Sequence, residues 1–232
     1  MKTTKNTLLL WDIDGTLVDT DRSGERSLVA LLRNLYDHET TPDLPMIEVQ
    51  GCTDTRIMLE LLAYLGHTPT EAETKRFRAA YLSGLLQALP RGQARVLPGI
   101  ARALQTVANQ PGLHQALLTG NLREGARLKL SHLNLWNYFQ FGAFADDHAD
   151  RNHLGPVALA RARENLGLDF SPHQVWIIGD TPRDIACGKA IGANTLAVAT
   201  GRFSKAQLAA HQPTCVLPDL TDTAALLHLM VN

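Results

Sequence analysis

The fold of this chain is decided near its start, where an apolar run ends in two aspartates: Leu8-Leu9-Leu10-Trp11-Asp12-Ile13-Asp14-Gly15-Thr16-Leu17. The run from Leu8 to Ile13 has the length and composition of a strand buried on both faces. Aspartates at i and i+2 project from one side of a strand end, and Gly15 lets the chain turn sharply after them. Two carboxylates this close repel each other unless a cation or a shared proton relieves the pair. The pattern therefore predicts a functional acidic site after the first strand.

Further apolar runs of strand length follow, and helical periodicity separates them. We predict strands at 8–13, 116–118, 139–144, 175–178, 195–199 and 215–217, with helices at 100–108, 122–133, 157–166, 184–190 and 205–210. This alternation is typical of βαβ units, in which a mostly parallel sheet carries helices on both faces. Ligands of such sheets bind at the carboxyl ends of the strands, so the candidate site should lie there.

One segment interrupts the alternation. Residues 21–95 contain no convincing strand pattern but several apolar stripes of helical spacing, such as Leu28, Leu31, Leu32 and Leu35. A helical block inserted after the first strand of an α/β domain indicates a lid or cap. We therefore expect a catalytic core formed by residues 1–20 and 96–232, and an all-helical cap domain at 21–95.

A second acidic element follows the strand predicted at 175–178: Gly179-Asp180-Thr181-Pro182-Arg183-Asp184. Asp180 comes directly after a buried strand, and acids from two strand ends would suit Mg²⁺, which prefers hard oxygen ligands. Asp184 has an alternative explanation, because Thr181 and Asp184 have the spacing of a helix capping box. We expect Asp180 to be a metal ligand, and Asp184 to be a ligand or a supporting acid.

A third strand end carries Leu117-Leu118-Thr119-Gly120-Asn121. Asn121 is predicted to be the N-cap of the next helix, with Glu124 three residues later. A helix N-terminus with free amides and a nearby hydroxyl is also an anion site. The same atoms can therefore cap the helix and bind a phosphate.

Charge and composition exclude several classes of protein. Lys and Arg total 22 against 23 Asp and Glu, a formal net charge of -1, so the chain lacks the basic surface that nucleic-acid binding requires. Three scattered cysteines (Cys52, Cys187 and Cys215) favour neither a disulfide framework nor a zinc site. The apolar run at the start is too short for a signal peptide, and no stretch suits a transmembrane helix. We expect a cytoplasmic protein without nucleic-acid or membrane partners.

The three polar elements together resemble a known family. Asp-Ile-Asp-Gly-Thr-Leu, Leu-Leu-Thr-Gly-Asn and Ile-Ile-Gly-Asp-Thr-Pro-Arg-Asp are similar to the first, second and fourth motifs of the haloacid-dehalogenase-like hydrolases. Gly51-Cys52-Thr53-Asp54 and Leu97-Pro98-Gly99 resemble the phosphoglycolate-phosphatase-like members that carry a helical cap. The resemblance covers nearly the whole chain and implies a Rossmann-like three-layer core.

The resemblance also implies a mechanism. Asp12 would attack phosphorus and form an aspartyl-phosphate, while Asp14 would act as general acid and then as general base. Magnesium would be held by Asp12, by the backbone carbonyl of Asp14 and by Asp180, with Asp184 beside them. Thr119 and the amides around Gly15, Gly120 and Asn121 would bind the phosphoryl oxygens. Since dehalogenases of this fold lack an acid at position 14, the sequence looks like a phosphatase.

The family's third motif is the point of departure. It is usually a lysine, whereas the corresponding stretch here, residues 146–153, has none. Arg151 is the predicted substitute, because a guanidinium is a permanent cation that can bind phosphate with several donors. Lys129 is its rival, on a helix face that we expect to be exposed to solvent.

We therefore predict a magnesium-dependent phosphatase acting on a small phosphorylated metabolite, phosphoglycolate-like or a sugar phosphate. Two alternatives stay open. One is a phosphomutase or a phosphonate-cleaving relative, of which the latter would need a cap lysine, and Lys75 is the cap's only one. The other is a catalytically idle binding protein that keeps the fold. Oligomeric state cannot be predicted from these residues.

Overall fold

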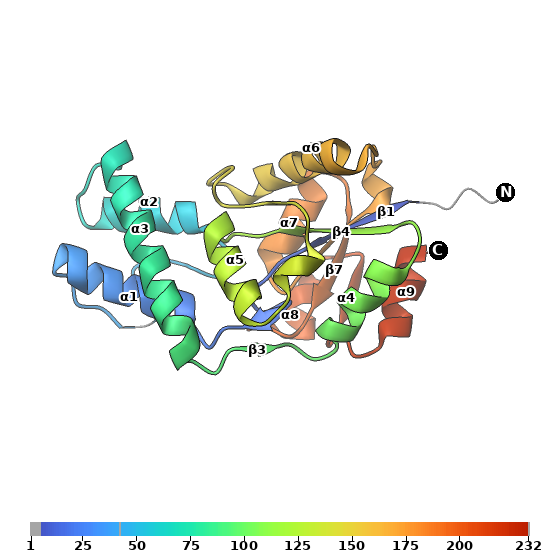
Figure 1. The fold of residues 1–232 in the computed structure, drawn as a ribbon, viewed down its shortest axis with the longest axis horizontal. Coiled ribbons are helices and arrows are strands. Elements are labelled where there is room, and N and C mark those ends of the chain that lie inside the picture. Colours follow the sequence, from blue (N-terminus) through green and yellow to red (C-terminus); the bar gives the residue numbers. More distant parts are fainter. Residues whose placement is uncertain (1–5, 42, 232) are drawn as a thin grey trace.

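A computed structural model describes residues 6–41 and 43–231, and a parallel sheet of six strands forms its centre (Figure 1). The strands lie in the order β5-β4-β1-β6-β7-β8. Their bounds are β1 Thr7–Trp11, β4 Leu113–Leu118, β5 Gly142–Ala143, β6 Val175–Gly179, β7 Asn194–Val198 and β8 Cys215–Leu217. Because β1 pairs in parallel with both β4 and β6, Trp11 lies beside Leu117 and Ile178. The segments that follow these three strands therefore leave the sheet at one edge.

Helices cover both faces of the sheet. Side chains of α4 (Ile100–Asn109), α5 (Arg123–His132) and α9 (Thr223–Val231) share one apolar cluster with Leu9 and Trp11 of β1. On the opposite face α6 (Leu154–Leu166) and α7 (Pro182–Ala190) pack against Leu8 and Leu10, and α8 (Lys205–Ala210) packs against β7 and β8. Successive residues of β1 are thus buried on alternate faces, which confirms the predicted Rossmann-like α/β core.

Three further helices form a separate unit beside the sheet (Figure 1). They are α1 (Ser23–Tyr36), α2 (Asp54–Tyr64) and α3 (Glu71–Ala88), and they enclose their own apolar cluster. Leu122 and Ala145, which follow β4 and β5, belong to the same cluster. The helical unit therefore packs against the carboxyl edge of the sheet.

Short elements complete the fold and differ most from the sequence-based prediction. The strands β2 (Val18–Asp19) and β3 (Arg95–Val96) pair antiparallel where the chain enters and leaves the helical unit, and two residues are too few to leave an alternating pattern. The strand predicted at 139–144 shrinks to β5, because only two of its residues pair with β4. The 3₁₀ helices are η1 Leu89–Arg91, η2 Trp136–Tyr138, η3 Arg151–His153 and η4 Pro172–Gln174. Within the described ranges, no helix combines the length and the apolar character needed to cross a membrane.

Candidate active site

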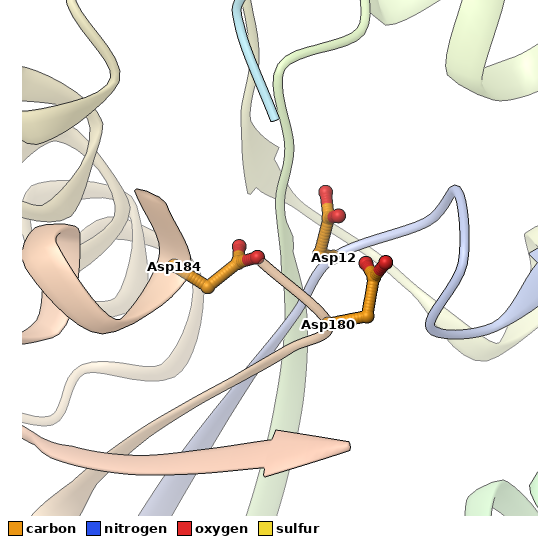
Figure 2. Close-up of side chains that lie close together, drawn as sticks. All are labelled: Asp12, Asp180 and Asp184. Atoms are coloured by element: carbon orange, nitrogen blue, oxygen red, sulfur yellow. The ribbon is translucent and has the colours of Figure 1, made fainter. Parts of the chain in front are cut away.

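Three carboxylates meet at the carboxyl edge of the sheet (Figure 2). Asp12 follows β1, Asp180 follows β6, and Asp184 lies in the first turn of α7. One oxygen of each lies within 4.8 Å of the others, and the three residues are only 4%, 4% and 2% exposed. Hard oxygen donors in such a cluster suit a divalent cation such as Mg²⁺. The carboxylate of Asp14 does not belong to this cluster, and the predicted metal ligand of that residue is its backbone carbonyl.

The electrostatics of the cluster favour binding of a cation. Burial raises the pKa of Asp12 to about 6, against the opposing effect of Arg151, and the charge of Asp184 adds to the rise. Burial and the charges of Asp184 and Asp12 likewise raise the pKa of Asp180 well above its ordinary value. Bringing these carboxylates together is therefore unfavourable without a positive charge between them.

Arg151 supplies one positive charge to the cluster. Its guanidinium is 5% exposed, lies 3.0 Å from Asp12 Oδ1 and forms a second ion pair with Asp184. It also donates hydrogen bonds to the carbonyl oxygens of Gly51 (3.3 Å) and Leu118 (3.4 Å). A buried cation thus lies beside Asp12, as the predicted substitute for the third-motif lysine would.

Lys129 is buried as well, and the prediction of a solvated position for it is wrong. This residue of α5 is 4% exposed, and its ammonium donates to Asp14 Oδ2 and to Asn121 Oδ1, each at 2.6 Å. The helix is enclosed because α3 packs on it from the helical unit: a Cβ at Gly125 would lie 3.6 Å from Leu85. Local sequence cannot reveal this burial, which depends on a segment about forty residues away.

Asn121 forms hydrogen bonds with two other predicted site residues, Asp14 and Thr119. Its side-chain amide donates to Asp14 Oδ2 at 2.8 Å and to Thr119 Oγ1 at 2.9 Å. Although burial acts to raise the pKa of Asp14, the charge of Lys129 and the hydrogen bonds it accepts keep that pKa below its ordinary value. The predicted N-cap role of Asn121 is wrong, because α5 begins one residue later with Leu122 at the N-cap and the Asn121 side chain is used for Asp14.

The N-terminus of α5 is capped by residues from elsewhere in the chain. The Leu122 amide donates to Asp54 Oδ2 at 2.8 Å, and the Asp54 amide donates to the Gly120 carbonyl at 2.6 Å. Tyr81 donates to the other oxygen of Asp54 at 3.4 Å, and burial raises the pKa of Asp54 to about 6. Asp54 therefore ties the helical unit to the predicted phosphate loop. Sequence reasoning singled out Asp54 only as part of a stretch that resembles the family and did not predict this capping role.

Two predicted site glycines have no room for a side chain. Gly15 has φ +78°, and a Cβ there would lie 2.6 Å from Asp180 Cγ. A Cβ at Gly120 would lie 3.0 Å from the carbonyl carbon of Cys52. Glycine at these positions lets the backbone approach closely, as a site that binds phosphoryl oxygens through amides requires.

Most of these residues, though not Thr119 or Asp184, line a cavity of about 370 Å³ between the helical unit and the sheet. Its wall includes the charged or polar residues Asp12, Asp14, Arg22, Tyr81, Asn121, Lys129, Arg151, Asp180 and Arg202. Cavities of this size hold small molecules. The arrangement can therefore bind a cation and an anionic small molecule next to Asp12 and Asp14.

Comparison with known proteins identifies the family. Residues 9–198 match the family model described as haloacid dehalogenase-like hydrolase. This chain belongs to that family. Among similar curated proteins, a probable phosphatase, IndB, of Dickeya dadantii is 26% identical, and the match covers 97% of this chain and 95% of that one. A phosphoglycolate phosphatase of Aquifex aeolicus is 28% identical over 81% of this chain and 82% of its own.

Solved structures share the fold of this haloacid dehalogenase-like hydrolase. A hydrolase from Pseudomonas syringae has a TM-score of 0.74 at 19% identity, with 98% of this chain and 100% of that one covered. The fold of the whole chain, including the helical unit, is therefore one that solved proteins have.

Proposed function

We propose that this hydrolase is a magnesium-dependent phosphatase that acts on a small phosphorylated metabolite through an aspartyl-phosphate at Asp12. The observation that carries the proposal is the cluster of Asp12, Asp180 and Asp184 with Arg151 beside it, at the edge of a cavity of about 370 Å³. Similar proteins named as phosphatases support the same reaction class.

The reaction would proceed in two displacements. A carboxylate oxygen of Asp12 attacks phosphorus, the bond from phosphorus to the leaving oxygen breaks, and Asp14 gives that oxygen a proton. Asp14 then takes a proton from the water that attacks the phosphorus, and the bond to Asp12 breaks. A magnesium ion held by Asp12, Asp180 and Asp184, with the Asp14 carbonyl, would offset negative charge between carboxylate and phosphate.

Other residues would bind the phosphoryl group and position Asp12. Arg151 neutralises Asp12, while Thr119 and the amides of Gly15, Gly120 and Asn121 would contact phosphoryl oxygens. Thr119 is fully buried and already accepts two hydrogen bonds from Asn121. In the proposed complex its hydroxyl hydrogen would donate to a phosphoryl oxygen.

The helical unit at 21–95 would serve as the cap, closing over the leaving group and excluding water. Its contacts through Asp54 bring it onto the phosphate loop. The proposed substrate is a phosphoglycolate-like compound or a sugar phosphate, because the cavity is small and polar. The cytoplasm is the proposed location of the protein. Lys75 is exposed and does not line the cavity, which gives no support to phosphonate cleavage through a Schiff base.

The test is a panel of phosphorylated metabolites assayed with Mg²⁺ and with excess chelator. Turnover should require Mg²⁺ and disappear in Asp12→Asn. Asp169→Asn is the matched control, because Asp169 is exposed and pairs only weakly with Arg163 at 3.4 Å. Turnover that survives chelation, or that survives loss of the Asp12 carboxylate, would contradict the mechanism.

A further inference from the structure

Lys129 is a buried charge to which the proposed mechanism assigns no role. Its ammonium lies 2.6 Å from Asp14 Oδ2 and 2.6 Å from Asn121 Oδ1. Helix α1 covers it closely: a Cβ at Gly24 would lie 3.9 Å from the Lys129 nitrogen and 3.3 Å from the Tyr81 hydroxyl. An ammonium this enclosed has little freedom to move, and taking it out of water is unfavourable unless its partners are well placed.

The two oxygens of Asp14 have unequal environments. Oδ2 accepts from both Lys129 and Asn121, at 2.6 and 2.8 Å. Oδ1 accepts from the Thr20 hydroxyl, at the longer distance of 3.3 Å. Rotating the carboxylate would break both short hydrogen bonds, so its orientation is fixed through Oδ2.

We propose that Lys129 is a positioning residue that holds Asp14 by Oδ2 and thereby presents Oδ1 to the leaving-group oxygen. The inference rests on the proposed phosphatase function and extends it to a residue outside the family motifs described above. Lys129 does not duplicate Arg151: it is Arg151 that forms the ion pair with Asp12, while the Lys129 ammonium is directed at Asp14 and Asn121.

Leaving groups of different basicity separate this role from phosphate binding. When the bond from phosphorus to an alkyl oxygen breaks, that oxygen needs the proton from Asp14 Oδ1. A 4-nitrophenolate is a stable anion and leaves without a proton. In the step that forms the aspartyl-phosphate, a residue that acts through Asp14 should therefore matter for alkyl phosphates and much less for 4-nitrophenyl phosphate.

The experiment compares Lys129→Met with wild type on 4-nitrophenyl phosphate and on an alkyl phosphate that wild type hydrolyses. We expect kcat/KM for the alkyl phosphate to fall about 100-fold and kcat/KM for 4-nitrophenyl phosphate to fall less than about tenfold. We compare kcat/KM because the later attack of water, in which Asp14 is the base, is common to both substrates and can limit kcat. Arg127→Met is the matched control, because Arg127 lies on the same helix, is exposed and pairs with Glu124; it should change neither rate. An equal fall of kcat/KM on both substrates would overturn the positioning role.

A second comparison does not depend on the folding of Lys129→Met. Asp14→Asn and the double variant Asp14→Asn/Lys129→Met both lack the acid, and the double variant also lacks the ammonium. Their rates on the alkyl phosphate should be equal, because a residue that acts through Asp14 has no effect once Asp14 is gone. A further fall in the double variant would overturn the inference while leaving the phosphatase proposal intact. If wild type shows no Mg²⁺-dependent turnover of any phosphate ester, the proposed function fails and this inference with it.

Discussion

Replacing Gly201 by alanine should displace a proposed metal ligand without removing any chemical group. Gly201 lies in the loop after β7, and a Cβ there would lie 2.7 Å from Asp180 Cγ and closer still to its carboxylate oxygen. The loop cannot retreat easily, because the neighbouring Thr200 hydroxyl donates to the Gly15 carbonyl at 2.6 Å. We therefore expect Asp180 to move rather than the loop.

The size of the effect follows from this distance. Two carbon atoms in contact prefer a separation of about 3.5–4.0 Å, so the Asp180 carboxyl group must shift by roughly 1 Å. Metal–ligand distances tolerate about 0.2 Å, and a misplacement of about 1 Å in a catalytic site can lower the rate about 100-fold. Overpacking itself should destabilise the fold by about 1–3 kcal/mol.

The assay is a Mg²⁺ titration of phosphatase activity, paired with thermal unfolding at each Mg²⁺ concentration. Gly201→Ala should need at least about tenfold more Mg²⁺ for half-maximal activity and gain less stability from the ion. Gly125→Ala in α5 is the control, because its Cβ would meet its nearest neighbour at an ordinary 3.6 Å. Alanine there should stabilise the helix by about 0.5–1 kcal/mol and leave the Mg²⁺ requirement unchanged.

A wild-type Mg²⁺ requirement and wild-type kcat in Gly201→Ala would refute the reasoning. That result would mean that the loop yields to the methyl group, or that Asp180 does not bind the metal. Asp180→Asn separates the two explanations, since it removes a ligand charge without steric pressure from the loop.

Three further predictions concern Asp54, Arg151 and Cys187. The pKa of Asp54 is raised from 3.8 to about 6, so its contribution to stability is greatest below about pH 4 and is lost as pH rises through 6. Asp54→Asn removes this titration, so the unfolding free energy of the variant should fall less than that of wild type between about pH 4 and pH 7. The difference should be on the order of 1–2 kcal/mol after allowance for partial exposure, as urea unfolding at each pH would measure. An unchanged pH dependence would contradict this prediction. Arg151→Met leaves Asp12 and Asp184 without their cation and should lower the unfolding free energy by about 3–5 kcal/mol, with part of the loss restored by Mg²⁺; equal stability with and without the ion would count against it. Burial raises the pKa of the Cys187 thiol to about 12, so iodoacetamide should label Cys187 in unfolded but not in native protein, as mass spectrometry would detect; rapid labelling of the native protein would show that the site opens.

Two of the three clustered acids could be predicted because each directly follows a strand. Asp12 comes after β1 and Asp180 after β6, and parallel neighbours bring their carboxyl ends together. Asp184 forms the predicted capping box, in which it accepts from the amide and hydroxyl of Thr181, and its other oxygen faces Arg151. Its predicted role at a metal stays a prediction. The order of the strands and the residues that follow them were therefore sufficient to predict that Asp12 and Asp180 lie close together.

Lys129 and Asp54 could not be placed in the same way. Lys129 lies on a face of α5 that α1 and α3 cover. The sequence pattern of α5 does not distinguish this covered face from a face exposed to solvent. Asp54 stood out in the sequence only as part of a stretch that resembles the family, yet it caps α5 from helix α2 of the helical unit. Both roles depend on where the helical unit sits on the sheet.

The sequence by itself determined the α/β fold, the helical insertion and the acids at the strand ends, because strand periodicity and the residues after each strand are local properties. Only the tertiary structure decided which charges face each other. Arg151 pairs with Asp12 and Asp184, and Lys129 pairs with Asp14. The physical reason is that an ion pair depends on distance in space and on exclusion of water, and both are set by the packing of segments far apart in the chain.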